Sequence, residues 1–189
     1  MHRRENLGEP MYGACSALKN LALKYKDYNI IFPVHLNPKV QETVYSILNN
    51  VENVHLINPL DYLDFVNLMS RSTLILTDSG GVQEEGPHFG IPVLVLREMT
   101  ERPEAVDFGT AKLVGLNEHN IFNAADNLLS NEKEYLQMAT AVNPYGDGLA
   151  AVRIIQAIKN YFNFSNAAID EFDPMKENDI PNHIVITEI

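Results

Sequence analysis

Two adjacent glycines at the start of a predicted helix are the strongest chemical signal in the sequence. They belong to Thr77–Glu85 (TDSGGVQEE), which follows an apolar strand-like run and leads directly into a helix. The first turn of a helix offers unpaired backbone N–H groups and the positive end of the helix dipole. Gly80 and Gly81 would let a diphosphate approach that backbone without a Cβ in the way, and Ser79 could both cap the helix and donate to a phosphate. For this segment taken alone, a tight turn without a ligand is the alternative.

Two charged side chains lie at spacings that suit a nucleotide held at this turn. Glu85 is about one helical turn further on, where its carboxylate could accept hydrogen bonds from both ribose hydroxyls. Stabilisation of the helix dipole is the simpler role for this residue. Arg102 follows the next predicted strand, at the rim where doubly wound sheets bind ligands, and could offset diphosphate charge. We expect Arg97, near the same rim, to be an exposed surface residue.

Histidines form a second set of candidates, and none of them has metal-like spacing. His2 lies in a basic N-terminal segment, and His35 ends a predicted strand beside a helix N-terminus. Solvation for His2, and a capping or core role for His35, are the alternatives to ligand binding. The sequence has no Cys/His cluster, Walker motif, G-x-S-x-G elbow or G-x-G-x-x-G pattern. We therefore expect neither a metal nor a cofactor.

The elements that must position these side chains alternate between strand and helix. Apolar runs predict strands at Asn29–Val34, Val54–Ile57, Thr73–Thr77, Val93–Leu96 and Lys112–Val114. Periodic segments predict helices at 11–26, from 38 onward, at 61–70, 80–89, 118–130, 132–141 and 148–162. This alternation predicts an α/β domain, with a Rossmann-like doubly wound parallel sheet covered on both faces.

The predicted domain covers residues 1–162, and residues 163–189 differ from it in composition. The latter carry six acids against one Lys, which predicts a disordered or extended acidic tail. The final IVITEI could still add to the sheet as an edge strand.

In the helix at 61–70, we expect Leu63, Val66 and Met69 to point inward.

Composition bounds the class of protein. The 189 residues, with 46% hydrophobic and 21% charged, suffice for one α/β domain. A net charge of −11 argues against a nucleic-acid surface, although a helix N-terminus and one Arg suffice for a diphosphate. The single cysteine, Cys15, which we expect half-buried on a helix, suits a reducing compartment. No apolar run approaches the roughly 20 residues that span a bilayer. We expect a cytoplasmic protein without nucleic-acid or membrane partners.

Five segments together resemble the non-hydrolysing UDP-N-acetylglucosamine 2-epimerases of bacteria. In chain order they are HRREN, PVHLNP, LILTDSGGVQEE, REMTERPEAV and NPYGDG, and they cover roughly residues 2–162. The turn sequence alone is less specific, because related sugar-nucleotide enzymes use a similar turn. The resemblance implies the C-terminal half of a glycosyltransferase B-type fold, in which two Rossmann-like domains hold a UDP-sugar between them.

The resemblance also implies roles for the residues of the glycine turn. Ser79, Gly80 and Gly81 would form the diphosphate cradle. Glu85 would bind the ribose, and Arg102 would make a further contact with the UDP-sugar.

Three more residues match positions with roles in that family. Phe65 resembles the position near the uracil, and His2 resembles a histidine beside the reacting sugar and diphosphate, which makes it the catalytic candidate. His35 resembles a histidine at a second, allosteric UDP-N-acetylglucosamine site.

The implied reaction inverts C2 of UDP-N-acetylglucosamine to give UDP-N-acetylmannosamine, by elimination and re-addition of UDP, for cell-surface polysaccharide synthesis. The family's acid-base carboxylates come mainly from an N-terminal domain that this sequence does not contain. We therefore expect the chain alone to bind UDP weakly and to be inactive, with that domain as partner in a homodimeric enzyme. The strand that leads into HRREN is also outside the sequence, so we expect exposed backbone and apolar surface in the sheet.

Other functions fit parts of the pattern. The donor-nucleotide domain of a UDP-sugar glycosyltransferase is the main alternative, and HRREN and NPYGDG favour the epimerase over it. A hydrolysing epimerase that releases free N-acetylmannosamine is another. A chain that binds a nucleotide sugar, or nothing, without catalysis is the non-enzymatic alternative.

Overall fold

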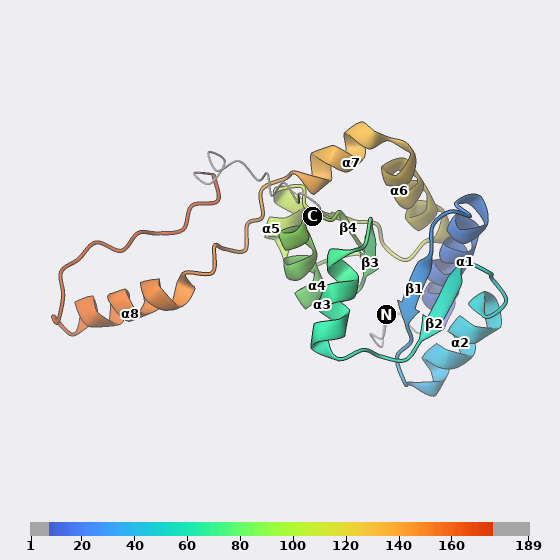
Figure 1. Cartoon of the computed structure of the whole chain (residues 1–189), viewed down its shortest axis with the longest axis horizontal. Helices are drawn as coiled ribbons and strands as arrows, with labels where there is room; N and C mark the ends of the chain where they lie inside the picture. The colour runs from blue at the N-terminus through green and yellow to red at the C-terminus, as the bar shows by residue number, and fades with distance from the viewer. Residues whose placement is uncertain (1–7, 176–189) are drawn as a thin grey trace, which may run out of the picture. The chain divides into compact units, whose positions relative to one another are not determined.

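Helices and strands alternate along the computed structural model, which describes residues 8–175 (Figure 1). The strands are β1 (Ile30–Pro33), β2 (Val54–Ile57), β3 (Ile75–Thr77), β4 (Val93–Val95) and β5 (Ala111–Leu113). The helices are α1 (Glu9–Lys24), α2 (Pro38–Leu48), α3 (Tyr62–Ser70), α4 (Gly80–Glu85), the 3-10 helix η2 (Gly86–Phe89), α5 (Pro103–Asp107), α6 (Glu118–Ser130), α7 (Glu132–Ala139) and α8 (Ala150–Tyr161). This order confirms the predicted α/β class.

The described strands form two parallel sheets rather than one. In the first sheet β1 pairs with β2, with Ile30 opposite Val54. In the second the order is β3-β4-β5, with Ile75 opposite Val93 and Val93 opposite Ala111. β4 is the central strand of the second sheet, and all three of its residues are buried. Parallel pairing with helical connections is the arrangement expected of βαβ units.

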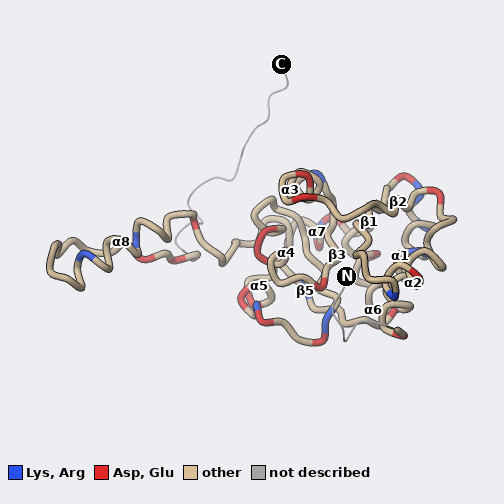
Figure 2. The backbone as a smooth tube through the Cα atoms, turned by 90° about the horizontal axis from the view of Figure 1, so that it is seen from below, with Lys and Arg blue, Asp and Glu red and all other residues tan. Residues whose placement is uncertain are grey.

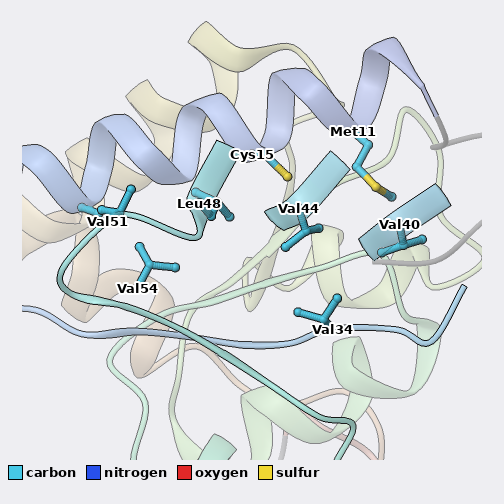
Figure 3. Close-up of a cluster of buried hydrophobic side chains, with 9 residues drawn as sticks. Met11, Cys15, Val34, Val40, Val44, Leu48, Val51 and Val54 are labelled. Atoms are coloured by element: carbon cyan, nitrogen blue, oxygen red, sulfur yellow. The ribbon is translucent and has the colours of Figure 1, made fainter. Parts of the chain in front are cut away.

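Helix α1 packs its two sides into two different hydrophobic clusters. Met11 and Cys15 join a cluster with side chains of α2 and of the strands β1 and β2 (Figure 3). Ala14, Ala17 and Leu21, offset by about one residue around the helix, join a second cluster with side chains of α6 and of the chain around β4. The core therefore lies on both sides of α1.

The chain from Gly80 to Phe89 departs from its predicted single helix. The α-helix ends at Glu85, and the chain continues as the 3-10 helix η2. Pro87 explains the change, because it has no N–H to donate and its ring opposes a continuous α-helix. Gly90 then ends the segment with φ of 66°, a conformation that glycine adopts without strain.

Two further details differ from the sequence-based expectations. Leu63 on α3 is 73% exposed, so the prediction that it points inward is wrong, whereas Met69 at the other end of the helix is buried as predicted. The short α5 was not predicted at all. It begins at Pro103, which suits a first helical position.

The described residues divide into two units, which meet between Ala141 and Val142. The second unit contains α8, which has no buried residue within it although it is amphipathic. Its apolar side chains Val152, Ile155 and Ile158 are each more than half exposed. Residues 163–175 form no helix or strand, and the predicted IVITEI strand lies outside the described residues.

The motif NPYGDG at the start of the second unit is held to α8 by an ion pair. Arg153 donates from its two terminal nitrogens to the two carboxylate oxygens of Asp147, at 2.7 and 2.6 Å. This pairing holds the pKa of Asp147 below its usual range. The carboxylate also accepts a hydrogen bond from the backbone N–H of Leu149, at 2.9 Å, just before the helix begins.

The Cys15 thiol should be inert while the chain is folded. The side chain is 1% exposed, so it is buried more deeply than the half-buried position that was expected. This burial raises the pKa of the thiol from 9.0 to about 11. Two pKa units mean about a hundredfold less thiolate. At about pH 8, labelling with a thiol reagent should be at least about a hundredfold slower than in denaturant. The variant Cys15→Ala provides the blank, and rapid stoichiometric labelling of the folded chain would contradict the burial.

Candidate functional site

The turn between β3 and α4 is the point on which the candidate residues converge. Ser79 has an extended backbone before the helix, and its N–H donates to Oγ1 of Thr77 at 3.0 Å. Within the described residues, the Ser79 hydroxyl caps no backbone N–H of α4, so the capping role expected for it is not seen. Asp78 beside it is 2% exposed. The turn is therefore fixed by backbone and buried polar contacts, while the first N–H groups of the helix have no side-chain cap.

Gly80 and Gly81 are not required by the packing of the turn. A Cβ on Gly80 would lie 3.6 Å from Cζ of Arg102, and one on Gly81 would lie 3.8 Å from Oε1 of Glu85, which are ordinary contacts. Neither glycine has a positive φ. Alanine would fit at both positions and suits a helix better. The two glycines thus leave backbone bare at the point where a ligand could approach it.

Two charged side chains stand over this bare backbone. The guanidinium of Arg102 lies beside Gly80, and the carboxylate of Glu85 lies beside Gly81. Arg102 also forms an ion pair through Nε with Glu84, and both partners are more than a third exposed. Arg102, Glu85 and the glycine turn, which sequence reasoning grouped together, are therefore neighbours in space.

A buried glutamine, which sequence reasoning did not single out, connects the turn to the loop that carries Arg102. Gln83 is fully buried, and its amide nitrogen donates to the carbonyl oxygen of Ser79 at 3.0 Å. Its amide oxygen accepts from the Thr100 hydroxyl at 2.6 Å. The same hydroxyl accepts from the backbone N–H of Arg102 at 3.0 Å. The place of the Arg102 backbone is thus set by hydrogen bonds that begin at the turn.

Phe65 belongs to the same region as the turn. It lies on α3, whose N-terminus is capped by Asp61, and it lines a cavity of about 790 Å³ together with Thr77, Ser79 and Val82. An aromatic ring in that wall could pack against the flat face of a base.

Of the two histidine candidates, the structure describes His35 alone. His35 follows β1, and its Nδ1 accepts a hydrogen bond from the backbone N–H of Asn37 at 3.1 Å. It is exposed and does not line the cavity beside Ser79. His2 lies outside the described residues, so its place relative to the turn stays a prediction.

Arg97 is not the exposed surface residue that we expected. Its side chain is only 12% exposed and forms a two-pronged ion pair with Glu101, at 2.5 and 2.8 Å. This pair braces the loop between β4 and α5, because the two residues are four positions apart on either side of its bend.

Acidic residues surround the turn. Asp and Glu recur on α3, α4 and α5, whereas Lys and Arg are sparse along that part of the backbone (Figure 2). A dianionic ligand would be repelled by these acids, so the cation of Arg102 carries more weight here than in a basic site. Among residues 8–175, no group of three or more His, Cys, Asp or Glu side chains is placed to share a metal ion. Nor does any helix in that range have the length and apolar character needed to cross a membrane.

A match to a family model shows which protein family this chain belongs to. The model for UDP-N-acetylglucosamine 2-epimerase matches residues 1–159 of the 189 residues. The chain belongs to the UDP-N-acetylglucosamine 2-epimerase family. The match covers every candidate site residue named above, and it confirms the resemblance inferred from the motifs.

Similar proteins agree with this membership of the epimerase family. A UDP-N-acetylglucosamine 2-epimerase of Yersinia pestis is 54% identical over 160 residues, which are 85% of this chain and 43% of that protein. A co-structure of S. aureus MnaA with UDP matches at 48% identity and a TM-score of 0.86, covering 91% of this chain and 47% of that one. The structure of UDP-GlcNAc 2-epimerase from Neisseria meningitidis bound to UDP-GlcNAc matches at 48% identity and a TM-score of 0.80. The match covers 84% of this chain and 43% of that one. The epimerase-family chain thus spans less than half the length of the relatives it matches.

Substitution of two glycines in this epimerase-family chain should distinguish a glycine that the packing does not require from one that it does. Gly81→Ala should raise the free energy of unfolding by about 0.5–1 kcal/mol, since the methyl group fits and the unfolded chain loses freedom. Gly86→Ala should lower it by about 1–3 kcal/mol, because the new Cβ would lie 2.8 Å from Cγ2 of Val93. Urea unfolding of both variants measures the two effects. A clear loss of stability in Gly81→Ala would mean that the fold itself requires this glycine.

Two substitutions at Thr100 should measure how much its hydroxyl contributes to the free energy of unfolding. Thr100→Val removes the donor to Gln83 and should lower the free energy of unfolding by about 1–2 kcal/mol, because the buried amide oxygen loses its partner. Thr100→Ser keeps the hydroxyl and should retain most of that stability. Equal loss in the two variants, measured by urea unfolding, would show that the methyl group matters and the hydrogen bond does not.

Proposed function

We propose that the chain is the UDP-binding, C-terminal half of a non-hydrolysing UDP-N-acetylglucosamine 2-epimerase. The whole enzyme would convert UDP-N-acetylglucosamine to UDP-N-acetylmannosamine by eliminating UDP and adding it back. One observation carries the proposal. Arg102 and Glu85 stand on either side of two helical glycines whose packing does not require glycine. Together with the family match, this favours a bound nucleotide sugar over an empty turn.

The diphosphate would lie against the backbone of Gly80 and Gly81, at the start of α4. Arg102 would offset its charge, and Ser79 would donate its hydroxyl. Because Arg102 also pairs with Glu84, the ligand has to share or displace that carboxylate. The ion pair with Glu84 holds the guanidinium in place before UDP arrives, and it lowers the affinity for UDP because the two anions compete for one cation.

The nucleoside end of UDP would run past Glu85 toward Phe65. The Glu85 carboxylate would accept from the two ribose hydroxyls, and the Phe65 ring would lie near the uracil. Thr77, Ser79 and Phe65 line one cavity, which supports a nucleoside that reaches from the turn toward Phe65.

The chemical step makes a demand that this half can meet only in part. Loss of the C2 proton and cleavage of the C1–oxygen bond leave a glycal and place negative charge on departing UDP. Arg102 and the start of α4 would stabilise that charge, as an oxyanion site does. His2 would assist at the reacting sugar. The carboxylates for proton transfer would come mainly from the N-terminal half, so the chain alone should not turn over substrate.

Several features of the whole enzyme follow the same proposal. We infer a homodimer that acts in cell-surface polysaccharide synthesis, with His35 at a second, regulatory nucleotide-sugar site. A cytoplasmic location suits a chain whose lone Cys15 is buried as a thiol. The exposed apolar residues of α8 would offer a surface to the N-terminal half of the whole enzyme.

Calorimetric titration with UDP tests the proposal. Glu85→Ala should weaken binding about 10- to 100-fold, because it removes charge-assisted hydrogen bonds worth about 1.5–3 kcal/mol. Glu52→Ala removes the same charge from an exposed site just before β2 and should bind UDP as the unchanged chain does. Equal affinities for all three proteins, or no detectable UDP binding by any of them, would refute the proposed site.

A further inference from the structure

The loop that carries Arg102 is held in place without apolar burial. It joins the end of β4 to the start of α5, and no residue from 97 to 104 is buried. Met99, in the middle of this loop, is 77% exposed. Burial of apolar surface therefore does not fix the place of Arg102, because the loop adds no side chain to the core. Polar contacts have to hold the loop instead.

One set of polar contacts runs from the glycine turn to this loop through Gln83, and we name it the Gln83–Thr100 relay. Nε2 of Gln83 donates to the carbonyl oxygen of Ser79 at 3.0 Å, and Oε1 accepts from the Thr100 hydroxyl at 2.6 Å. The Thr100 oxygen in turn accepts from the backbone N–H of Arg102 at 3.0 Å. Gln83 is fully buried, so both ends of its amide bond within the protein instead of to water.

The Ser79 end of the relay also orients a backbone N–H of the turn. A peptide unit is planar and trans, so the carbonyl of Ser79 and the N–H of Gly80 lie in one plane and point in opposite directions. A hydrogen bond that fixes this carbonyl therefore fixes the direction of that N–H. The amide of Gln83 thus joins the orientation of the turn to the place of the Arg102 backbone.

The side chain of Arg102 is held by the next residue of the same helix. Its Nε pairs with the carboxylate of Glu84, which is 38% exposed, whereas Gln83 is buried. Together the two contacts bring the guanidinium to Gly80, where an added Cβ would lie 3.6 Å from Cζ. A ligand anion competes with Glu84 for the cation. The buried relay is out of its reach and keeps holding the backbone.

The residue types suit a relay. Position 100 requires a group that donates and accepts at once, which a hydroxyl does. Position 83 requires a donor and an acceptor on one group, which a primary amide has. Thr100→Val keeps the shape of the side chain and removes both bonds, while Thr100→Ser retains them.

We propose that Thr100 and Gln83 are positioning residues for the nucleotide diphosphate, an inference that rests on the proposed function. Both act through Arg102 and the turn, without contacting the ligand. Thr100 fixes the backbone from which the guanidinium extends, and Gln83 joins that backbone to the turn against which the diphosphate lies. The cation and the turn therefore keep one spacing before the ligand arrives. Charge that develops on departing UDP is then stabilised by groups that do not have to move.

Titration with UDP, followed by NMR so that weak binding is measured, tests Thr100. Thr100→Val should weaken UDP binding at least about fivefold, because a displaced cation loses contact with the diphosphate. Thr100→Ser should bind within about twofold of the unchanged chain, because it keeps the hydroxyl. Thr43→Val makes the same change on α2, where the hydroxyl donates to the Lys39 carbonyl at 3.1 Å, and should leave UDP binding unchanged. Equal affinities for Thr100→Val and Thr100→Ser would overturn the proposal.

A double-mutant cycle separates positioning from a general loosening of the fold. Arg102→Ala removes the guanidinium that the relay is proposed to place. In that background Thr100→Val should change UDP affinity by less than about twofold, because the residue through which it acts is absent. The same weakening with and without the guanidinium would refute the positioning of Arg102 and leave Thr100 with a structural role.

Gln83→Met tests the other end of the relay with an apolar side chain of similar length. It should weaken UDP binding at least about fivefold, because the turn and the loop are no longer joined. The double variant with Thr100→Val should be at most about twofold weaker than either single variant, since the two residues act as one unit. Additive losses would overturn the relay. Because Gln83 is fully buried, the Thr100 variants decide the proposal if Gln83→Met does not fold.

Amide exchange in the absence of UDP distinguishes this inference from the proposed function. The Arg102 N–H should exchange at least about tenfold faster in Thr100→Val than in Thr100→Ser, since only the latter keeps an acceptor for it. Equal exchange in the two variants would refute the relay, whatever the chain binds. A relay that is intact by this measure, in a chain that does not bind UDP, would instead refute the proposed function and with it the role assigned to Thr100.

Discussion

The structure depends on α1, because this one helix joins the two sheets by side-chain burial. No backbone ladder connects β1 to β3 in the described chain, so the sheets are held together mainly by what α1 packs against on each side. Small residues make this possible. Ala14 and Ala17 let α1 approach its neighbours closely, and Gly13 comes so near the Leu116 carbonyl that an added Cβ would be 2.8 Å from it. Burial of apolar surface is non-directional, so it can join sheets without fixing their separation as backbone hydrogen bonds would.

The candidate site depends on a second, directional set of contacts. The amide of Gln83 orients the turn and, through Thr100, the loop of Arg102. Buried polar groups of this kind are costly unless each is satisfied, and here the amide nitrogen and oxygen both have partners. The backbone of Arg102 is therefore placed by a chain of hydrogen bonds that begins at the turn. Its ion pair with Glu84 adds a charge partner that a nucleotide would have to share.

Much of the fold and of the local site could be predicted, because those parts depend on short-range patterns. β2 and α6 lie within the predicted ranges at both ends, since an apolar run and a capped, periodic segment define them. The grouping of Glu85 with the glycine turn also follows from spacing along one helix. Contacts between distant residues could not be predicted in the same way. Gln83 and Thr100 are 17 positions apart, and their residue types alone do not predict that they share a hydrogen bond.

Some failures have a different origin. Leu63 has the spacing of a buried residue, but it lies in the first turn of α3, where the helix buries none of its side chains. Arg97 was expected to be exposed because arginine usually is, yet a carboxylate four residues away allows its side chain to lie almost buried. In both cases the tertiary environment outweighs the preference of the residue type.

The divided sheet has a consequence for how this protein behaves in a mixture. A partner that binds only the folded form adds stability in proportion to the logarithm of its free concentration. The melting temperature of such a chain is then a property of the solution and its stoichiometry, as well as of the sequence. Strand edges that stay unpaired in the folded chain are open to pairing with any extended polypeptide nearby.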